Sequence, residues 1–183
     1  SRSIILNESS TYSSTVTFAA SSGTIASVTI NDSDAFDLKA LTITGNLTVT
    51  AGGDITDSGT VSVGGNLSAT TDANNGAISL GTLEVNGTIA LTTNGNGAAT
   101  IVNDDGINFA ASTVRGALNA TATTGDITDT GALAITGTST LTTSENNATI
   151  TLDVTSNAFN DAVTITTNDD SGTDADVTID GGT

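Results

Sequence analysis

Aspartate, clustered with asparagine and glycine, is the residue type in this sequence with the clearest potential for binding chemistry. Four short Asp-rich segments occur, at 31–34, 72–76, 103–106 and 168–176. Carboxylate and amide oxygens at alternate positions around a glycine can converge on a hard cation such as calcium. The best candidates for one such site are Asp169, Asp170, Asp174 and Asp176. No segment has the spacing of an EF-hand, and Asp and Asn also form ordinary solvated turns, which is the competing interpretation.

Catalytic residue types are scarce. The chain has no His and no Cys, which excludes Ser-His-Asp and Cys-His nucleophiles and imidazole or thiolate metal ligands. Its only basic residues, Lys39, Arg2 and Arg115, are scattered along the chain. Paired carboxylates can hydrolyse glycosidic bonds, so a polysaccharide-acting β-helix enzyme is a remote alternative. Such a cleft normally also holds aromatic or basic residues, and we therefore expect no enzymatic activity and no cofactor other than calcium.

The charge balance is strongly acidic. The 183 residues include 20 Asp and Glu but only 3 Lys and Arg, a formal net charge of −17. This excludes nucleic acid and anionic membrane surfaces as direct electrostatic partners, because both need basic patches. No segment approaches the roughly 18 consecutive apolar residues of a membrane span, so membrane insertion is not expected.

The elements that would position these residues are short β-strands. Apolar residues alternate over three to five positions and are interrupted by Gly or Asn before a helical turn could form. The segment GDITDSG at 53–59 returns at 125–131 as GDITDTG. We interpret its aspartates, Asp54 and Asp57, as corner residues rather than as ligands or catalysts. The repetition and the small β-branched composition predict an all-β parallel solenoid whose coils stack about 4.8 Å apart.

The coils can be counted on Leu/Val-x-Ile/Val couplets. These couplets begin at Leu41, Val61, Leu83, Leu133 and Val163, with a weaker one at Val114. Their spacings of 20, 22, 31, 19 and 30 residues predict irregular rungs of about 19–31 residues. Each rung would have three strands and three corners in a triangular coil, with apolar residues facing the axis and Thr facing water. Residues 1–183 are expected to form a single β-solenoid segment that is a fragment of a much longer repetitive chain.

A Thr-rich β-helix face suggests a test for ice binding, which needs a T-x-T array on one face in successive coils. Thr pairs at 42/44, 48/50 and 136/138 fit this pattern. The pattern fails at 62/64, at 84/86 and at Arg115, which argues against that activity.

Three longer runs carry a family resemblance. They are GNLTVTAGGDITDSGTVSVGGNLSATT (45–71), TTGDITDTGALAITGTSTLTT (123–143) and NATITLDVTSNAFNDAVTIT (147–166). These runs resemble the repeats of filamentous-haemagglutinin-type exoproteins, the large bacterial adhesins of two-partner secretion, which are related in architecture to autotransporter passengers. The resemblance covers about 40–183 and, more weakly, 4–39. It implies a right-handed parallel β-helix stalk that is exported and displayed at the bacterial cell surface.

The expected function is therefore structural: a stalk or adhesin segment of a large secreted or surface-displayed protein, used in adhesion, biofilm or fibre formation. Its partners would be a host-cell or matrix surface ligand and further copies of the chain, stacked end to end into fibres. The main alternative is a calcium-stabilised tandem β-sandwich adhesin module.

Overall fold

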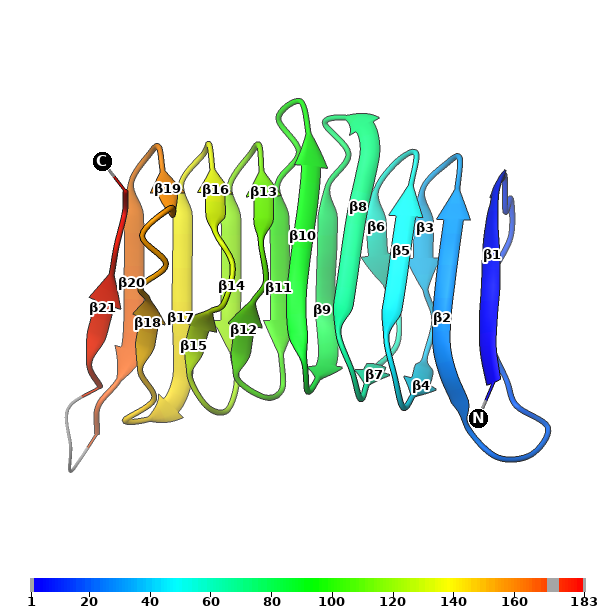
Figure 1. The fold of residues 1–183 in the computed structure, drawn as a ribbon, viewed down its shortest axis with the longest axis horizontal. Helices are drawn as coiled ribbons and strands as arrows, with labels where there is room; N and C mark the ends of the chain where they lie inside the picture. Colours follow the sequence, from blue (N-terminus) through cyan, green and yellow to red (C-terminus); the bar gives the residue numbers. More distant parts are fainter. Residues whose placement is uncertain (1, 171–174, 183) are drawn as a thin grey trace.

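The chain is a right-handed parallel β-helix of about 8 turns (Figure 1). The computed structural model describes residues 2–170 and 175–182, and within these every pairing between strands is parallel. The predicted fold class is confirmed. A tandem β-sandwich requires antiparallel pairing, so that alternative is wrong. The described residues contain no helix that could cross a membrane.

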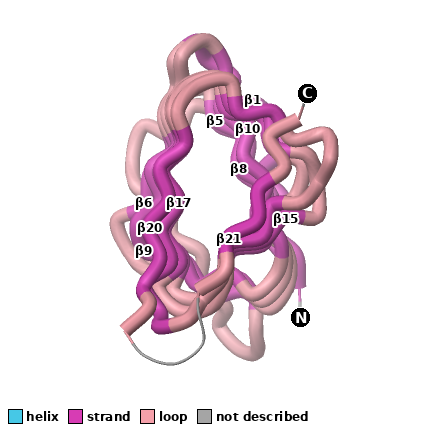
Figure 2. The backbone as a smooth tube through the Cα atoms, turned by 90° about the vertical axis from the view of Figure 1, so that its left-hand side faces the viewer, coloured by secondary structure: helices cyan, strands magenta, loops and turns pink. Residues whose placement is uncertain are grey.

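The strands form two facing walls, which Figure 2 shows in a view along the rod. The coils are flattened rather than triangular, because a long strand on one wall faces a pair of short strands on the other. We call the wall that begins with β1 wall 1. It contains β1 (Arg2–Ser10), β2 (Ile25–Asp32), β5 (Leu47–Ala51), β8 (Leu67–Asn74), β10 (Thr88–Asn94), β12 (Ile107–Phe109), β13 (Ser112–Val114), β15 (Ile127–Asp129), β16 (Leu133–Ile135), β18 (Ile150–Leu152), β19 (Ala158–Phe159) and β21 (Val177–Ile179).

The opposite wall, wall 2, carries the remaining strands. It contains β3 (Phe36–Leu38), β4 (Leu41–Ile43), β6 (Ile55–Asp57), β7 (Val61–Val63), β9 (Ile78–Val85), β11 (Ala99–Asn103), β14 (Leu118–Ala122), β17 (Ser139–Asn146) and β20 (Val163–Asn168). The separation of register partners varies along the rod. It is 19 residues between Val28 and Leu47, 20 between Leu47 and Leu67, and 27 between Ile150 and Val177.

Alternating side chains fill the space between the walls. In β5, Leu47, Val49 and Ala51 are buried, whereas Thr48 and Thr50 point outward and are partly exposed. The same alternation recurs in most strands from β2 to β18, so one continuous core of Val, Leu, Ile, Ala and Phe runs from Ile25 to Leu152. Burying one such aliphatic side chain contributes roughly 1.5–3 kcal/mol, and like side chains stacked in successive coils share that burial.

The long strand changes walls midway along the rod. Up to β8 it lies on wall 1, with the short pairs β3/β4 and β6/β7 opposite; from β11 onward it lies on wall 2, with the short pairs on wall 1. The change occurs where β9 replaces a short pair by pairing with both β6 and β7. The next strand, β10, is long and pairs with both β12 and β13 of the following coil. We call residues 81–95, which contain the end of β9 and all of β10, the half-turn insertion.

This insertion explains a wrong prediction about the couplets. Leu41, Val61 and Leu83 do stack in one column, as predicted. The couplet that begins at Leu133 lies on wall 1, however, whereas Val163 lies on wall 2 and stacks on Ser139. The two longest spacings, 31 and 30 residues, therefore join couplets on opposite walls and are not the lengths of single coils.

Glycine stands at the corner that precedes each of the long strands β5, β8, β10, β11, β14 and β17. Gly45, Gly65 and Gly87 stack in one column, where the N–H of each of the last two donates to the carbonyl of the glycine before it at 3.0 Å. A second column contains Gly97, Gly116 and Gly137, linked in the same way at 2.7 and 3.1 Å. A Cβ on Gly116 would lie 2.5 Å from the Asn96 carbonyl oxygen, so the coils approach too closely there for any side chain.

Buried polar side chains close the corner that follows a long strand. The hydroxyls of Thr71, Thr93 and Thr143 donate to the carbonyls of Gly76, Gly97 and Ala148, at 3.0, 2.7 and 3.3 Å. Asn103 has the same role and donates to the Gly106 carbonyl at 2.8 Å. The expectation that Thr faces water is therefore wrong for these three threonines, which satisfy turn carbonyls inside the rod.

Replacing Gly116 by alanine is expected to destabilise the rod by about 1–3 kcal/mol, because the new Cβ would push adjacent coils apart. Gly81→Ala is the matched control, since its Cβ would meet no atom closer than 3.9 Å and should change stability by no more than about 0.5 kcal/mol. Chemical denaturation followed by circular dichroism measures both. Equal loss in the two variants would contradict the close approach at Gly116.

Candidate functional site

The two copies of the GDITD motif lie on opposite walls and make the same kind of hydrogen bond. The first aspartate of each copy accepts a backbone N–H at the start of a strand in the next coil. Asp54 Oδ1 accepts from Ala77 at 2.8 Å, and Asp126 Oδ1 accepts from Thr149 at 2.6 Å. Each carboxylate thus caps the strand of the next coil that pairs with the strand of its own motif. In the first copy β9 pairs with β6, and in the second β18 pairs with β15.

The second aspartate of each copy also binds the next coil. The Asp57 carboxylate accepts the backbone N–H groups of Gly81 and Thr82, at 2.9 and 2.7 Å, and the Thr82 hydroxyl at 2.9 Å. Asp129 is buried and accepts the Asp153 N–H at 3.1 Å and the Asn157 side-chain amide at 2.6 Å. Asp54 stands at the corner before β6, as interpreted, whereas Asp57 is the last residue of that strand and binds the backbone of the next coil.

Replacing Asp57 by alanine is expected to destabilise the rod by about 1–3 kcal/mol, because two backbone N–H groups of β9 lose a charged acceptor. Asp105→Ala, at an exposed corner, is the control for the loss of one negative charge. Thermal unfolding midpoints of both variants provide the measurement. A similar decrease for both would show that net charge, and not the cap, accounts for the effect.

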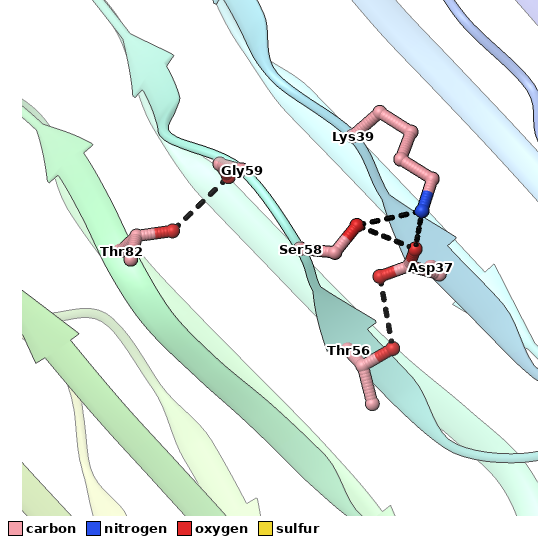
Figure 3. A network of polar contacts seen from close by, with 6 residues as sticks. All are labelled: Asp37, Lys39, Thr56, Ser58, Gly59 and Thr82. Atoms are coloured by element: carbon pink, nitrogen blue, oxygen red, sulfur yellow. Dashed lines mark hydrogen bonds and ion pairs between the residues drawn. The ribbon is translucent and has the colours of Figure 1, made fainter.

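An ion pair and two hydroxyls surround Asp37 on wall 2 (Figure 3). Lys39 Nζ lies 2.5 Å from Asp37 Oδ2 and donates to Ser58 Oγ at 2.7 Å. Ser58 Oγ in turn donates to Asp37 Oδ2 at 2.7 Å, and Thr56 Oγ1 donates to Asp37 Oδ1 at 3.2 Å. Partial burial acts to raise the pKa of Asp37, but the hydrogen bonds from Lys39, Ser58 and Thr56 and the lysine charge together hold this pKa below its ordinary value of 3.8. The network links β3 to β6, two strands of adjacent coils.

The lowered pKa gives a pH dependence with a defined sign. The ionised Asp37 carboxylate stabilises the folded state. This contribution is complete above the unfolded-state pKa of 3.8 and is lost as pH falls through the lower folded-state pKa of Asp37. Lys39→Gln should therefore raise the pKa of Asp37 and reduce stability at pH 7 by at most about 1 kcal/mol, since the pair is partly exposed. An NMR titration of the Asp37 carboxyl measures the shift. Arg115→Gln is the charge-matched control and should leave the pKa of Asp37 unchanged.

The calcium candidates lie at the last corner of the rod. Asp169 and Asp170 follow β20, and Asp176 directly precedes β21. The Asp170 N–H donates to Asn146 Oδ1 at 2.7 Å, and the Asp176 carbonyl accepts the Ile150 N–H at 3.0 Å. Asp174 lies outside the described residues. Within residues 2–170 and 175–182, no group of three or more His, Cys, Asp or Glu side chains could hold a metal ion. A calcium site of all four aspartates stays a prediction.

Two shallow surface hollows lie where β9 meets β11 and where the next corner begins. The first, of about 300 Å³, is lined by Glu84 and Asp104 together with Thr, Val, Leu and Gly residues. The second, of about 420 Å³, is lined by Asp105, Asp126 and mainly Asn and Gly. Neither lining includes the aromatic or basic residues expected beside a catalytic carboxylate pair. Both hollows are therefore acidic, but their lining residues do not indicate a particular reaction.

The sequence did not identify the outward threonines of the long strands as a set. Register places Thr48 over Thr29 and Ser68, and Thr50 over Asn31 and Thr70, so these side chains form continuous columns on wall 1. The T-x-T comparison at 62/64, 84/86 and Arg115 used residues that lie outside these columns. Glycine does not separate the long strands from the short ones, because it also stands two residues before the short strands β6, β7, β15 and β16. The longer run of alternation, as in Leu47–Ala51, is the signal that could have located the long strands.

Comparison with known proteins adds a family match. A family model described as repeats of unknown function (DUF5649) matches residues 25–80 and 96–166, more than half of the chain. The interval between the two matched segments coincides with the half-turn insertion. No curated protein and no solved structure matches the chain.

Proposed function

The chain belongs to the DUF5649 repeats, and from this premise we propose that it is a stalk segment of a secreted, surface-displayed bacterial adhesin of the filamentous-haemagglutinin type. The observation that carries the proposal is the uninterrupted stacking of coils. One core runs from Ile25 to Leu152, and backbone hydrogen bonds join successive coils at the corners. Such a rod resists bending and can hold a binding surface away from the cell.

The surface charge suits a long repetitive rod. The net charge of −17 keeps a long repetitive β-structure soluble and opposes aggregation of the rods. The proposed ligand is a component of a host-cell or matrix surface. End-to-end stacking of further coils into fibres belongs to the same proposal, since parallel pairing can continue in either direction along the axis.

Display of the chain on a non-adherent bacterium tests the proposal. Retention of these cells under flow, on host-cell monolayers and on matrix-coated glass, should exceed that of cells displaying the carrier alone by several-fold. Unchanged retention on both surfaces would contradict the adhesive role. Small-angle scattering of the purified chain tests the stalk separately: eight coils predict a rod about 40 Å long, and a spherical particle would contradict it.

A further inference from the structure

Four asparagine–glycine pairs lie close together in the middle of the rod. They are Asn75–Gly76, Asn86–Gly87, Asn94–Gly95 and Asn96–Gly97. All four asparagines are exposed. Three of the pairs lie at the corners after β8 and β10, which rise above the other corners along that edge of the rod (Figure 1). Because glycine has no Cβ, its backbone N–H is the least hindered neighbour that an asparagine side chain can have.

Such a pair can modify itself without an enzyme, because the two reacting groups are neighbours in one chain. The glycine nitrogen attacks the asparagine Cγ and closes a succinimide ring. The bond between Cγ and Nδ2 breaks, and the side-chain nitrogen leaves as ammonia with the proton that the glycine nitrogen has lost. Water then opens the ring. Attack at Cγ gives aspartate, whereas attack at the backbone carbonyl gives isoaspartate, in which the main chain runs through Cγ. No oxidation or reduction occurs.

The hydrogen bonding of the glycine N–H distinguishes the four pairs. In three of them this group is occupied. The N–H groups of Gly76, Gly87 and Gly97 donate to the carbonyls of Ala73, Gly65 and Asn94, at 3.2, 3.0 and 2.9 Å. Among the described residues, the Gly95 N–H has no such acceptor. A nitrogen whose proton is held by a carbonyl must first lose that hydrogen bond before it can attack.

Exposure of the glycine gives the same ranking independently. Gly95 is exposed, whereas Gly76 and Gly97 are buried and Gly87 is half-buried. Gly95 also has a φ of +60°, a conformation that glycine adopts without strain. Solvent can therefore remove the proton of the Gly95 nitrogen, while the other three glycine nitrogens are shielded by the coils around them.

We infer that Asn94 is a self-modification site, which converts through a succinimide to aspartate and isoaspartate ahead of the other three pairs. Its side-chain Nδ2 donates to the carbonyls of Thr71 and Asp72, at 3.2 and 3.4 Å. These long hydrogen bonds are weak and hold only the nitrogen that departs. Both carbonyls can accept equally from the ammonia that is released, so they do not oppose its departure. The inference does not depend on the proposed function.

The reaction changes a contact between two coils. Either product carries a carboxylate where the Asn94 amide donated to the carbonyls of Thr71 and Asp72, so oxygen atoms then face oxygen atoms. Isoaspartate also removes from the main chain the Asn94 carbonyl, which accepts the N–H groups of Asn75 and Gly97 at 3.1 and 2.9 Å. Each event adds one negative charge to the formal −17. We therefore expect the corner after β10 to open more often as the protein ages, while the core stays folded.

Incubation of the purified chain at mildly alkaline pH tests the ranking. Peptide mapping by mass spectrometry measures the conversion of amide to acid at each of the four asparagines. Asn94 should react several-fold faster than Asn75, Asn86 and Asn96, which are matched controls within the same molecule. In denaturant the four rates should converge, because the hydrogen bonds of the glycine N–H groups are lost. An equal or faster rate at any other pair of the folded chain would overturn the inference.

Two pairs of variants test the site and its effect. Asn94→Gln should remove most of the isoaspartate that an isoaspartyl methyltransferase assay detects, whereas Asn86→Gln should remove little; equal losses would count against Asn94. Asn94→Asp, which has the charge of the product, should speed amide hydrogen exchange at Asn75 and Gly97 several-fold and leave the circular dichroism spectrum unchanged. Asn86→Asp is the charge-matched control. Equal exchange in these two variants would contradict the opening of the corner.

Discussion

The spacing between successive coils is the constraint on which the rest of this structure depends. Parallel pairing holds neighbouring strands about 4.8 Å apart, and the chain must keep this spacing at its corners as well as in its strands. At the corner before β14 only a hydrogen atom fits between successive backbones, at Gly116. At other corners a side chain from one coil binds the backbone of the next, as Asp57 does for Gly81 and Thr82. The small residues and the short polar side chains at the corners are therefore consequences of the spacing between coils.

Local alternation made the fold class predictable. Leu47, Val49 and Ala51 alternate with threonine, which is the pattern of a half-buried β-strand. The return of the GDITD motif favoured stacked coils over a β-sandwich. The change of walls was not predictable from the couplets, because an apolar pair looks the same on either wall. Val114 and Leu83 read as successive members of one series although they lie on opposite walls. The glycine columns record the change, since Gly87 and Gly97 are only half a coil apart.

The polar contacts were predictable from the sequence only where they belong to a repeated motif. Asp54 and Asp57 stand in a motif that returns 72 residues later, and a motif repeated along a stack of coils favours a structural role. The network of Asp37, Lys39 and Ser58 depends on which residues of adjacent coils face each other, and that register appears only in the structure. The general expectation that threonine faces water in a half-buried strand does not hold for Thr71 and Thr143. The need to satisfy a turn carbonyl inside the rod outweighed that preference.

The half-turn insertion has a consequence for how genes of this kind can grow. Gly87 and Gly97 are ten residues apart, and the rod continues without a break because either wall accepts a long strand or a short pair. A duplication of about ten codons is therefore as compatible with stacking as one of twenty. It differs in effect, since an odd number of half-coils turns every later surface to the other side of the rod. Small changes in gene length can thus redirect a distant binding surface without altering one of its residues.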